Sequence, residues 1–108
     1  MTVMFCSYDK QPLILRLYGT AKTIHPRDPQ WQTRILQFPE TTGARQIYEM
    51  DIEMVQTSCG FAVPHMAFES ERDTLKKWAT KQGPAGIETY WQKKNQTSLD
   101  GFETGIIE

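Results

Sequence analysis

RQIYEMDIEMVQTSCGFAVP, residues 45–64, contains the strand around which the other elements of this chain are expected to be arranged. In its first half, Met50, Ile52 and Met54 alternate with acidic residues, which is the period of a strand with one face on a core and one in water. The alternation ends in small and polar residues followed by Gly60. Because such a strand end lets a ligand approach the backbone closely, the stretch predicts a β-strand with a candidate small-molecule site at its end.

The composition indicates one globular domain of modest size. The chain has 108 residues, of which 39% are hydrophobic and 23% charged, so it is neither long enough for two domains nor polar enough to be disordered. A net charge of -1, with no run of like charge longer than a Lys-Lys pair, argues against a nucleic-acid-binding face. There is no long apolar run and no signal-peptide pattern. Together with two widely separated cysteines, Cys6 and Cys59, this predicts a cytoplasmic protein with reduced, buried thiols and no membrane span.

Two further strands are expected before the central stretch. Residues Thr2–Tyr8 are almost continuously apolar and rich in β-formers, which predicts a strand buried on both faces. Residues Leu13–Ile24 alternate, with an apolar face that narrows to Gly19 and Ala21. The short polar segment Asp9–Pro12 between the two predicts an antiparallel hairpin.

A short helix is expected between the second strand and the central one. Asp28 followed by Pro29 predicts a helix start, with an acceptor at the N-cap and a proline in the first turn. Trp31, Ile35 and Phe38 then recur at helical spacing, and Pro39 ends the helix.

The C-terminal part of the chain predicts one short strand and two helices. Val63–Phe68 is a candidate strand, and Ser70–Gln82 a helix that Ser70 can cap. Gly83 is the expected C-cap, with a second helix running from Pro84 to about Asn95.

Most catalytic and metal-binding motifs are absent from the sequence. There is no glycine-rich loop that would hold a phosphate before a helix, and neither His25 nor His65 lies at zinc-finger spacing from a cysteine. Cys59 and His65 lack an evident orienting acid, so Cys59 is interpreted as a packed thiol rather than a nucleophile. No metal site is predicted, and no catalytic side chain is identified.

Three groups of polar residues are candidates for ligand binding, each with a structural alternative. Arg16 lies inside an apolar strand, either on a solvated face or as a partner for a carboxylate or phosphate. Gln56, Thr57 and Ser58 either bind a ligand at a strand end or hydrogen-bond their own backbone. Lys93–Asn95 closes a helix, where cations favour the helix dipole.

The motifs resemble those of the pyridoxamine 5'-phosphate oxidase-related flavin-binding proteins, in order and over nearly the whole chain. They are Phe5–Tyr8, Leu15–Ala21, His25–Pro29, Gly43–Arg45, Val55–Gly60, Val63–Pro64, Glu71–Asp73 with Trp78, Tyr90–Trp91, Lys94–Asn95 and Ser98–Gly101. The Gln-Thr-Ser-Cys-Gly run and the Ser-Leu-Asp-Gly run are the specific ones.

This resemblance implies an α+β fold, an antiparallel split β-barrel of the FMN-binding type with peripheral helices. It also implies a homodimer that holds FMN in a groove at the dimer interface and carries out flavin-mediated redox chemistry on an unknown small molecule. The residues that match the cofactor-contacting motifs are Arg16, Gln56, Thr57, Ser58, Lys94 and Asn95.

The resemblance also implies an incomplete domain. Members of this family carry several tens of residues, including barrel strands, before the segment that Val3–Phe5 matches, so residues 1–108 are expected to be the C-terminal part of a single domain. Two alternatives to an FMN-dependent oxidoreductase therefore stay open. One is a non-catalytic flavin carrier, sensor or dimerising remnant, and the other is a groove that holds a deazaflavin or haem.

Overall fold

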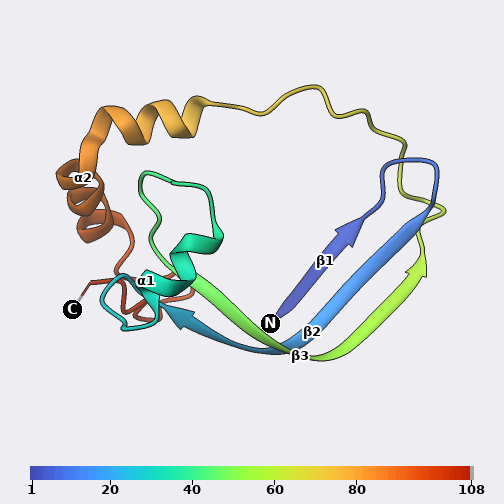
Figure 1. The fold of residues 1–108 in the computed structure, drawn as a ribbon, viewed down its shortest axis with the longest axis horizontal. Coiled ribbons are helices and arrows are strands. Elements are labelled where there is room, and N and C mark those ends of the chain that lie inside the picture. The colour runs from blue at the N-terminus through green and yellow to red at the C-terminus, as the bar shows by residue number, and fades with distance from the viewer. Residues whose placement is uncertain (108) are drawn as a thin grey trace. The chain divides into compact units, whose positions relative to one another are not determined.

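The computed structural model describes residues 1–107, in which there are three strands, two α-helices and one 3₁₀ helix (Figure 1). In chain order the elements are β1 (Thr2–Cys6), β2 (Leu13–Ile24), α1 (Trp31–Arg34), the 3₁₀ helix η1 (Ile35–Gln37), β3 (Ile47–Cys59) and α2 (Thr74–Lys94). This content confirms the α+β class, while the split barrel stays a prediction.

The chain divides into two compact units. Residues 1–22 and 48–71 form the first, here called the sheet unit. Residues 23–47 and those from Arg72 onward form the second, here called the helical unit. Each unit is described by itself below.

The sheet has the strand order β1-β2-β3, and its first two strands form the expected hairpin. They pair antiparallel, in a register that runs from Thr2 opposite Tyr18 to Cys6 opposite Ile14. The backbone N–H of Ser7 donates to the carbonyl of Leu13 at 2.9 Å and closes the turn. The predicted bounds of β2 are confirmed, as is the placing of β3 inside residues 45–64.

At Gly19 the backbone of β3 lies close to that of β2. A Cβ atom at this position would lie 2.0 Å from the carbonyl oxygen of Asp51 and 3.1 Å from the Cα of Ile52. No side chain fits such a gap, so the narrowing of the strand to a glycine, visible in the sequence, is what permits the approach.

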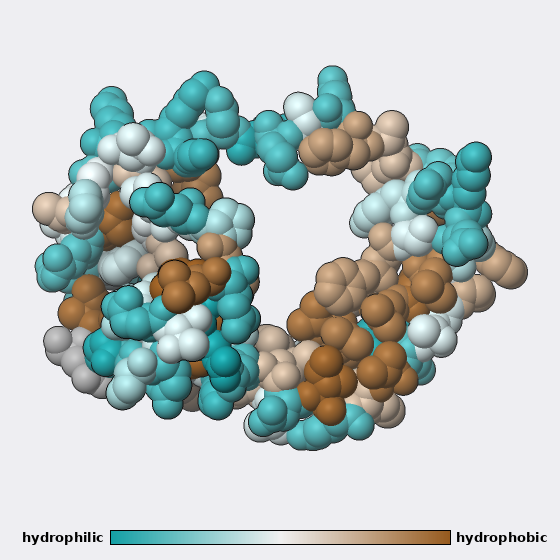
Figure 2. All heavy atoms as spheres, viewed as in Figure 1, coloured by the Kyte–Doolittle hydropathy of each residue, from teal (hydrophilic) through white to brown (hydrophobic). Residues whose placement is uncertain are grey.

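The prediction that the first strand is buried on both faces is wrong. Met4 and Phe5 of β1 are 57% and 53% exposed. The strand order places β1 at an edge of the sheet, where it pairs with β2 along one side. Figure 2 shows hydrophobic side chains gathered over β1 and β2 on the face in view. Apolar composition predicted a strand here correctly, but it did not reveal whether another layer covers that strand.

The expected burial of the central strand is also wrong. Ile52 and Met54, which the alternation placed on a core, are each 53% exposed, and Met50 is half-buried. Alternation fixes which residues share a face. It does not determine whether that face is covered.

The candidate strand Val63–Phe68 does not form. Residues 60–73 are irregular, although the backbone N–H of Met66 donates to the carbonyl of Tyr8 at 3.1 Å. One such bond between the segments does not make a ladder.

The helical unit has a small apolar core built on Ile24, Trp31 and Ile47, with Ile35 and Ala44 packed against it. The helical spacing of Trp31 and Ile35 is therefore confirmed as a core stripe. Phe38, which was expected to continue the stripe, is 52% exposed at the end of η1 and does not join the core. Asp28, however, is not the N-cap, because that position belongs to Gln30.

Asp28 stabilises the turn before the helix instead. Its Oδ2 accepts a hydrogen bond from the backbone N–H of His25 at 2.7 Å, and its carbonyl accepts from the N–H of Trp31 at 3.0 Å. The aspartate thus serves as a turn residue, a role that such short acceptors commonly take.

The helix predicted from Ser70 begins four residues later, at Thr74, with Asp73 as its N-cap residue. The break predicted at Gly83 and Pro84 is confirmed. Gly83 adopts φ 65° and ψ 175°, so α2 consists of two helical segments joined at a kink. Pro84 then starts the second segment, where its missing N–H costs little.

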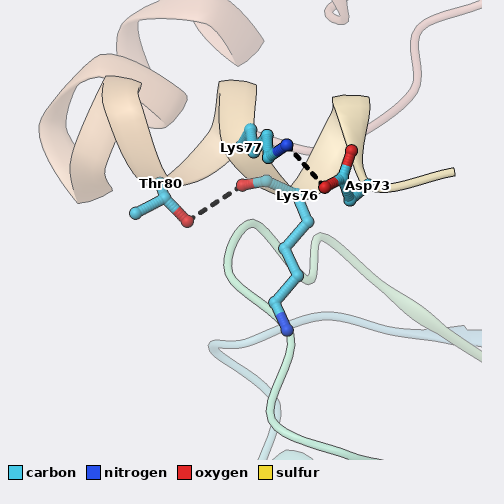
Figure 3. Close-up of polar contacts among 4 residues, drawn as sticks. All are labelled: Asp73, Lys76, Lys77 and Thr80. Carbon is cyan, nitrogen blue, oxygen red and sulfur yellow. Dashed lines mark hydrogen bonds and ion pairs between the residues drawn. The ribbon is translucent and has the colours of Figure 1, made fainter.

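Local contacts support the first segment of α2. The Nζ of Lys77 lies 2.6 Å from the Oδ2 of Asp73, and the hydroxyl of Thr80 donates to the carbonyl of Lys76 at 2.9 Å (Figure 3). Across the kink, the rings of Trp78 and Tyr90 meet edge to face with centroids 5.2 Å apart. This aromatic pair links the two segments.

None of the helices among residues 1–107 combines the length and the apolar character that crossing a membrane requires.

Candidate functional site

A row of side-chain hydrogen bonds joins β2 to β3 on one face of the sheet. The Nη1 of Arg16 donates to the Oγ of Ser58 at 3.0 Å, and the hydroxyl of Tyr18 donates to the Oε1 of Gln56 at 3.1 Å. The two donors are two residues apart on β2 and the two acceptors two apart on β3, so each pair shares a face of its strand. We call these four residues the polar face.

Arg16 is the cation of the polar face. It is half-buried, and the bond to Ser58 occupies one of the five N–H donors of its guanidinium group. A planar group with further donors beside a serine hydroxyl and an amide suits a phosphate or a carboxylate, which guanidinium can bind through two parallel hydrogen bonds.

Towards the C-terminal end of β2, the side-chain contacts to β3 involve carboxylates. The hydroxyl of Thr20 donates to Glu53 at 2.7 Å, and the Nζ of Lys22 lies 2.6 Å from Glu49. Lys22 neutralises Glu49, whereas the carboxylate of Glu53 would repel an anion, and the hydrogen bonds of Arg16 and Tyr18 to β3 involve no carboxylate. An anionic ligand is therefore favoured beside Arg16, Gln56 and Ser58.

Thr57 does not share the polar face. Strand alternation places it on the opposite side from Gln56 and Ser58, and its side chain is exposed. The sequence grouped these three residues as one run, and the structure brings two of them together with Arg16.

Lys94 and Asn95 lie at the C-terminal end of α2, in the helical unit. Asn95 is the C-cap residue, and its carbonyl accepts a hydrogen bond from the hydroxyl of Thr104 at 2.5 Å. Lys94 is exposed in the last turn, where a cation favours the helix dipole. Both residues have a structural role here, and their part in cofactor binding stays a prediction.

A curated protein is similar in sequence to nearly the whole of this chain. It is the "Pyridoxamine 5'-phosphate oxidase family protein ustO" of Aspergillus flavus, 33% identical over 116 aligned residues that cover 94% of this chain. The chain is similar to a protein of the pyridoxamine 5'-phosphate oxidase family. The resemblance predicted from the sequence motifs is thereby confirmed.

The similarity covers only part of this relative. The chain spans about half the length of this curated relative, namely 47%. No family model matches the chain, and no solved structure matches it.

Neither cysteine is placed as the sequence predicted. Both are free, but Cys6 is half-buried and Cys59 is exposed, so the interpretation of Cys59 as a packed thiol is wrong. Cys59 ends β3, at a point that the described structure leaves open to solvent. Within residues 1–107, no group of three or more His, Cys, Asp or Glu side chains is arranged to hold a metal ion.

Tyr18 is the member of the polar face that was not predicted from the sequence as a ligand-binding residue. A signal for it was present, because it lies two residues beyond Arg16 in an alternating strand and so must share its face. What the sequence could not supply was the register of β3 against β2, which places Gln56 opposite the tyrosine hydroxyl.

Proposed function

We propose that this chain forms part of an FMN site in an oxidoreductase-like protein of the pyridoxamine 5'-phosphate oxidase family, with a substrate still to be identified. The single observation that carries the proposal is the polar face. Its arginine, hydroxyls and amide are held together across two strands, away from the acidic end of the sheet.

The donor set of the polar face fits the chemistry of FMN. Arg16 would bind an anionic or electron-rich part of the cofactor, and Ser58 would share that end of the site. The amide of Gln56 can both donate and accept, which suits the edge of a flavin ring. Thr57, Lys94 and Asn95 are proposed as further contacts. FMN, when bound, supplies the redox chemistry, and the protein supplies position and electrostatics.

The family relationship also supports a wider proposal about assembly and location. We propose a homodimer with a split-barrel core and the cofactor groove at its interface. The cytoplasm is the proposed compartment, since both thiols are free and a reducing environment keeps them so.

An FMN titration of the purified chain tests the proposal, with flavin fluorescence and visible absorbance as readouts. Arg16→Gln is expected to weaken FMN binding by about tenfold or more, because a charge-assisted hydrogen bond is lost. Lys22→Gln is the matched control, since it removes one positive charge from the same strand but from a 62% exposed side chain beside Glu49. Binding that is absent in the unaltered chain, or equally weakened by both substitutions, would contradict the proposal.

A second candidate function is a flavin carrier or sensor without catalysis. It is favoured by the composition of the polar face, which brings together Arg16, Tyr18, Gln56 and Ser58 but no histidine, cysteine or carboxylate. Oxidation of reduced nicotinamide separates the two candidates. Turnover by the FMN-loaded chain well above that of free FMN would exclude the carrier.

The identity of the cofactor has its own test. Mass spectrometry of the small molecule that co-purifies from cells is expected to give the mass of FMN. A deazaflavin or a haem in its place would show that a related groove holds a different group.

A further inference from the structure

The helical unit contains a cavity that is separate from the polar face. Its volume is about 740 Å³, and its apolar walls include Trp31, Ile35, Ile87 and Trp91. Small-molecule sites commonly have volumes of roughly 300–1,000 Å³ and are lined mainly by apolar and aromatic side chains. None of the residues proposed to contact FMN lines this cavity.

One wall is fixed by a close contact between a loop and α2. Gly43 adopts φ 83°, which side-chain-bearing residues rarely take up, and a Cβ there would lie 3.5 Å from the Cδ1 of Ile87. The loop therefore packs on a residue that is 5% exposed. This contact holds the loop and the second segment of α2 as two sides of one cavity.

A second wall is formed by the C-terminal residues, which Arg27 holds in place. Its Nη2 donates to the carbonyl of Gly105 at 2.7 Å, and its Nη1 donates to the carbonyl of Ile106 at 3.3 Å. Ile106 and Arg27 both line the cavity. The guanidinium of Arg27 therefore positions the C-terminal residues that form this wall of the cavity.

Arg45 also lines the cavity, and its situation differs from that of Arg27. It is half-buried, and it makes no hydrogen bond or ion pair with any other residue of the 1–107 range. The two carboxylates that line the same cavity, Glu40 and Glu88, are exposed and make no ion pair with Arg45. A half-buried arginine beside apolar walls is stabilised when an anion pairs with it.

We propose that this cavity binds a small, planar, apolar carboxylate. The ring of the ligand occupies the apolar space lined by Trp31 and Trp91, and its carboxylate pairs with Arg45. Aromatic stacking and a charge-assisted hydrogen bond are the two interactions that this lining offers. The inference goes beyond the proposed flavin function, because it uses none of the residues of the polar face.

A titration with 2-naphthoate, followed by tryptophan fluorescence, tests the inference on the full chain. Saturable binding is expected, and Arg45→Gln is expected to weaken it about tenfold through loss of the charged pair. Arg72→Gln is the matched control, since Arg72 is an exposed arginine of the same unit that does not line the cavity. Its affinity should equal that of the unaltered chain.

A neutral analogue, 2-naphthalenemethanol, makes the test independent of whether Arg45→Gln folds well. The unaltered chain should bind the alcohol about tenfold more weakly than the carboxylate, and Arg45→Gln should bind both alike. Equal affinity of the unaltered chain for the two probes would overturn the inference, as would a lack of saturable binding. Displacement of 2-naphthoate by stoichiometric FMN would also overturn it, because the cavity would then belong to the flavin site.

Discussion

At the scale of single residues, two glycines are required for different physical reasons. Gly19 is needed because the backbone of β3 occupies the space that a side chain would take. Gly83 has open space around it, and it is needed because its φ of 65° is unfavourable for any residue with a Cβ. The first constraint is one of packing between strands and the second is one of backbone conformation.

Gly19→Ala is expected to destabilise the protein by about 1–3 kcal/mol, the usual range for atoms forced into an occupied space. The new methyl group would lie 2.0 Å from the carbonyl oxygen of Asp51, and only movement of the backbone can relieve that contact. Urea unfolding followed by circular dichroism measures the change. A suitable comparison is Gly86→Ala, where the nearest atoms belong to the flexible side chain of Gln82. Equal unfolding midpoints for the two variants would contradict the account of Gly19.

At the scale of elements, the kink in α2 is the clearest link between sequence and structure. A glycine followed by a proline predicted both the end of one helical segment and the start of the next, and both are present. The hairpin of β1 and β2 was predictable for a similar reason, since short polar turns and alternation are local signals. Helix caps were less predictable, because Asp28 and Ser70 could serve equally well as turn residues.

Gly83→Ala is expected to lower the free energy of unfolding by about 1–2 kcal/mol, because alanine is strained at positive φ. Gly83→Asn should cost about as much, since φ 65° with ψ 175° lies outside the left-handed helical region that asparagine tolerates. Urea unfolding measures the change for both variants. An alanine variant as stable as the unaltered chain would mean that φ at this position is not fixed by the fold.

The polar face shows where sequence-based prediction of the site reached its limit. Arg16, Gln56 and Ser58 were selected as candidates, and the structure brings them together. Thr57 was grouped with them by adjacency, although strand alternation separates it. Lys94 and Asn95 came from the family resemblance, and local physical chemistry accounts for them as the end of a helix.

At the scale of the whole molecule, the chain buries few large apolar side chains. No side chain among the described residues has a relative exposure below 2%, and large apolar residues of both units are exposed. Composition predicted enough apolar residues for a core. It could not predict that β1 would lie at a sheet edge with Met4 and Phe5 uncovered, because coverage depends on other layers of the assembly.

Self-association is the expected consequence of these exposed apolar surfaces and is also what the proposed homodimer requires. The chain has a mass of 12.5 kDa, so light scattering after size exclusion should give about twice that value. Phe5→Lys, which places a charge on the edge strand, should shift the mass towards the monomer. A monomer at all concentrations for the unaltered chain would contradict the dimer proposal.

We propose that the polar face, and not another part of the chain, holds FMN. Amide and side-chain NMR shifts of the labelled chain, followed during addition of FMN, test this assignment. Saturable shifts concentrated at Arg16, Tyr18, Gln56 and Ser58 are expected, with the residues around Arg45 unaffected. Shifts concentrated at the lining of the cavity in the helical unit, with the polar face unchanged, would contradict it.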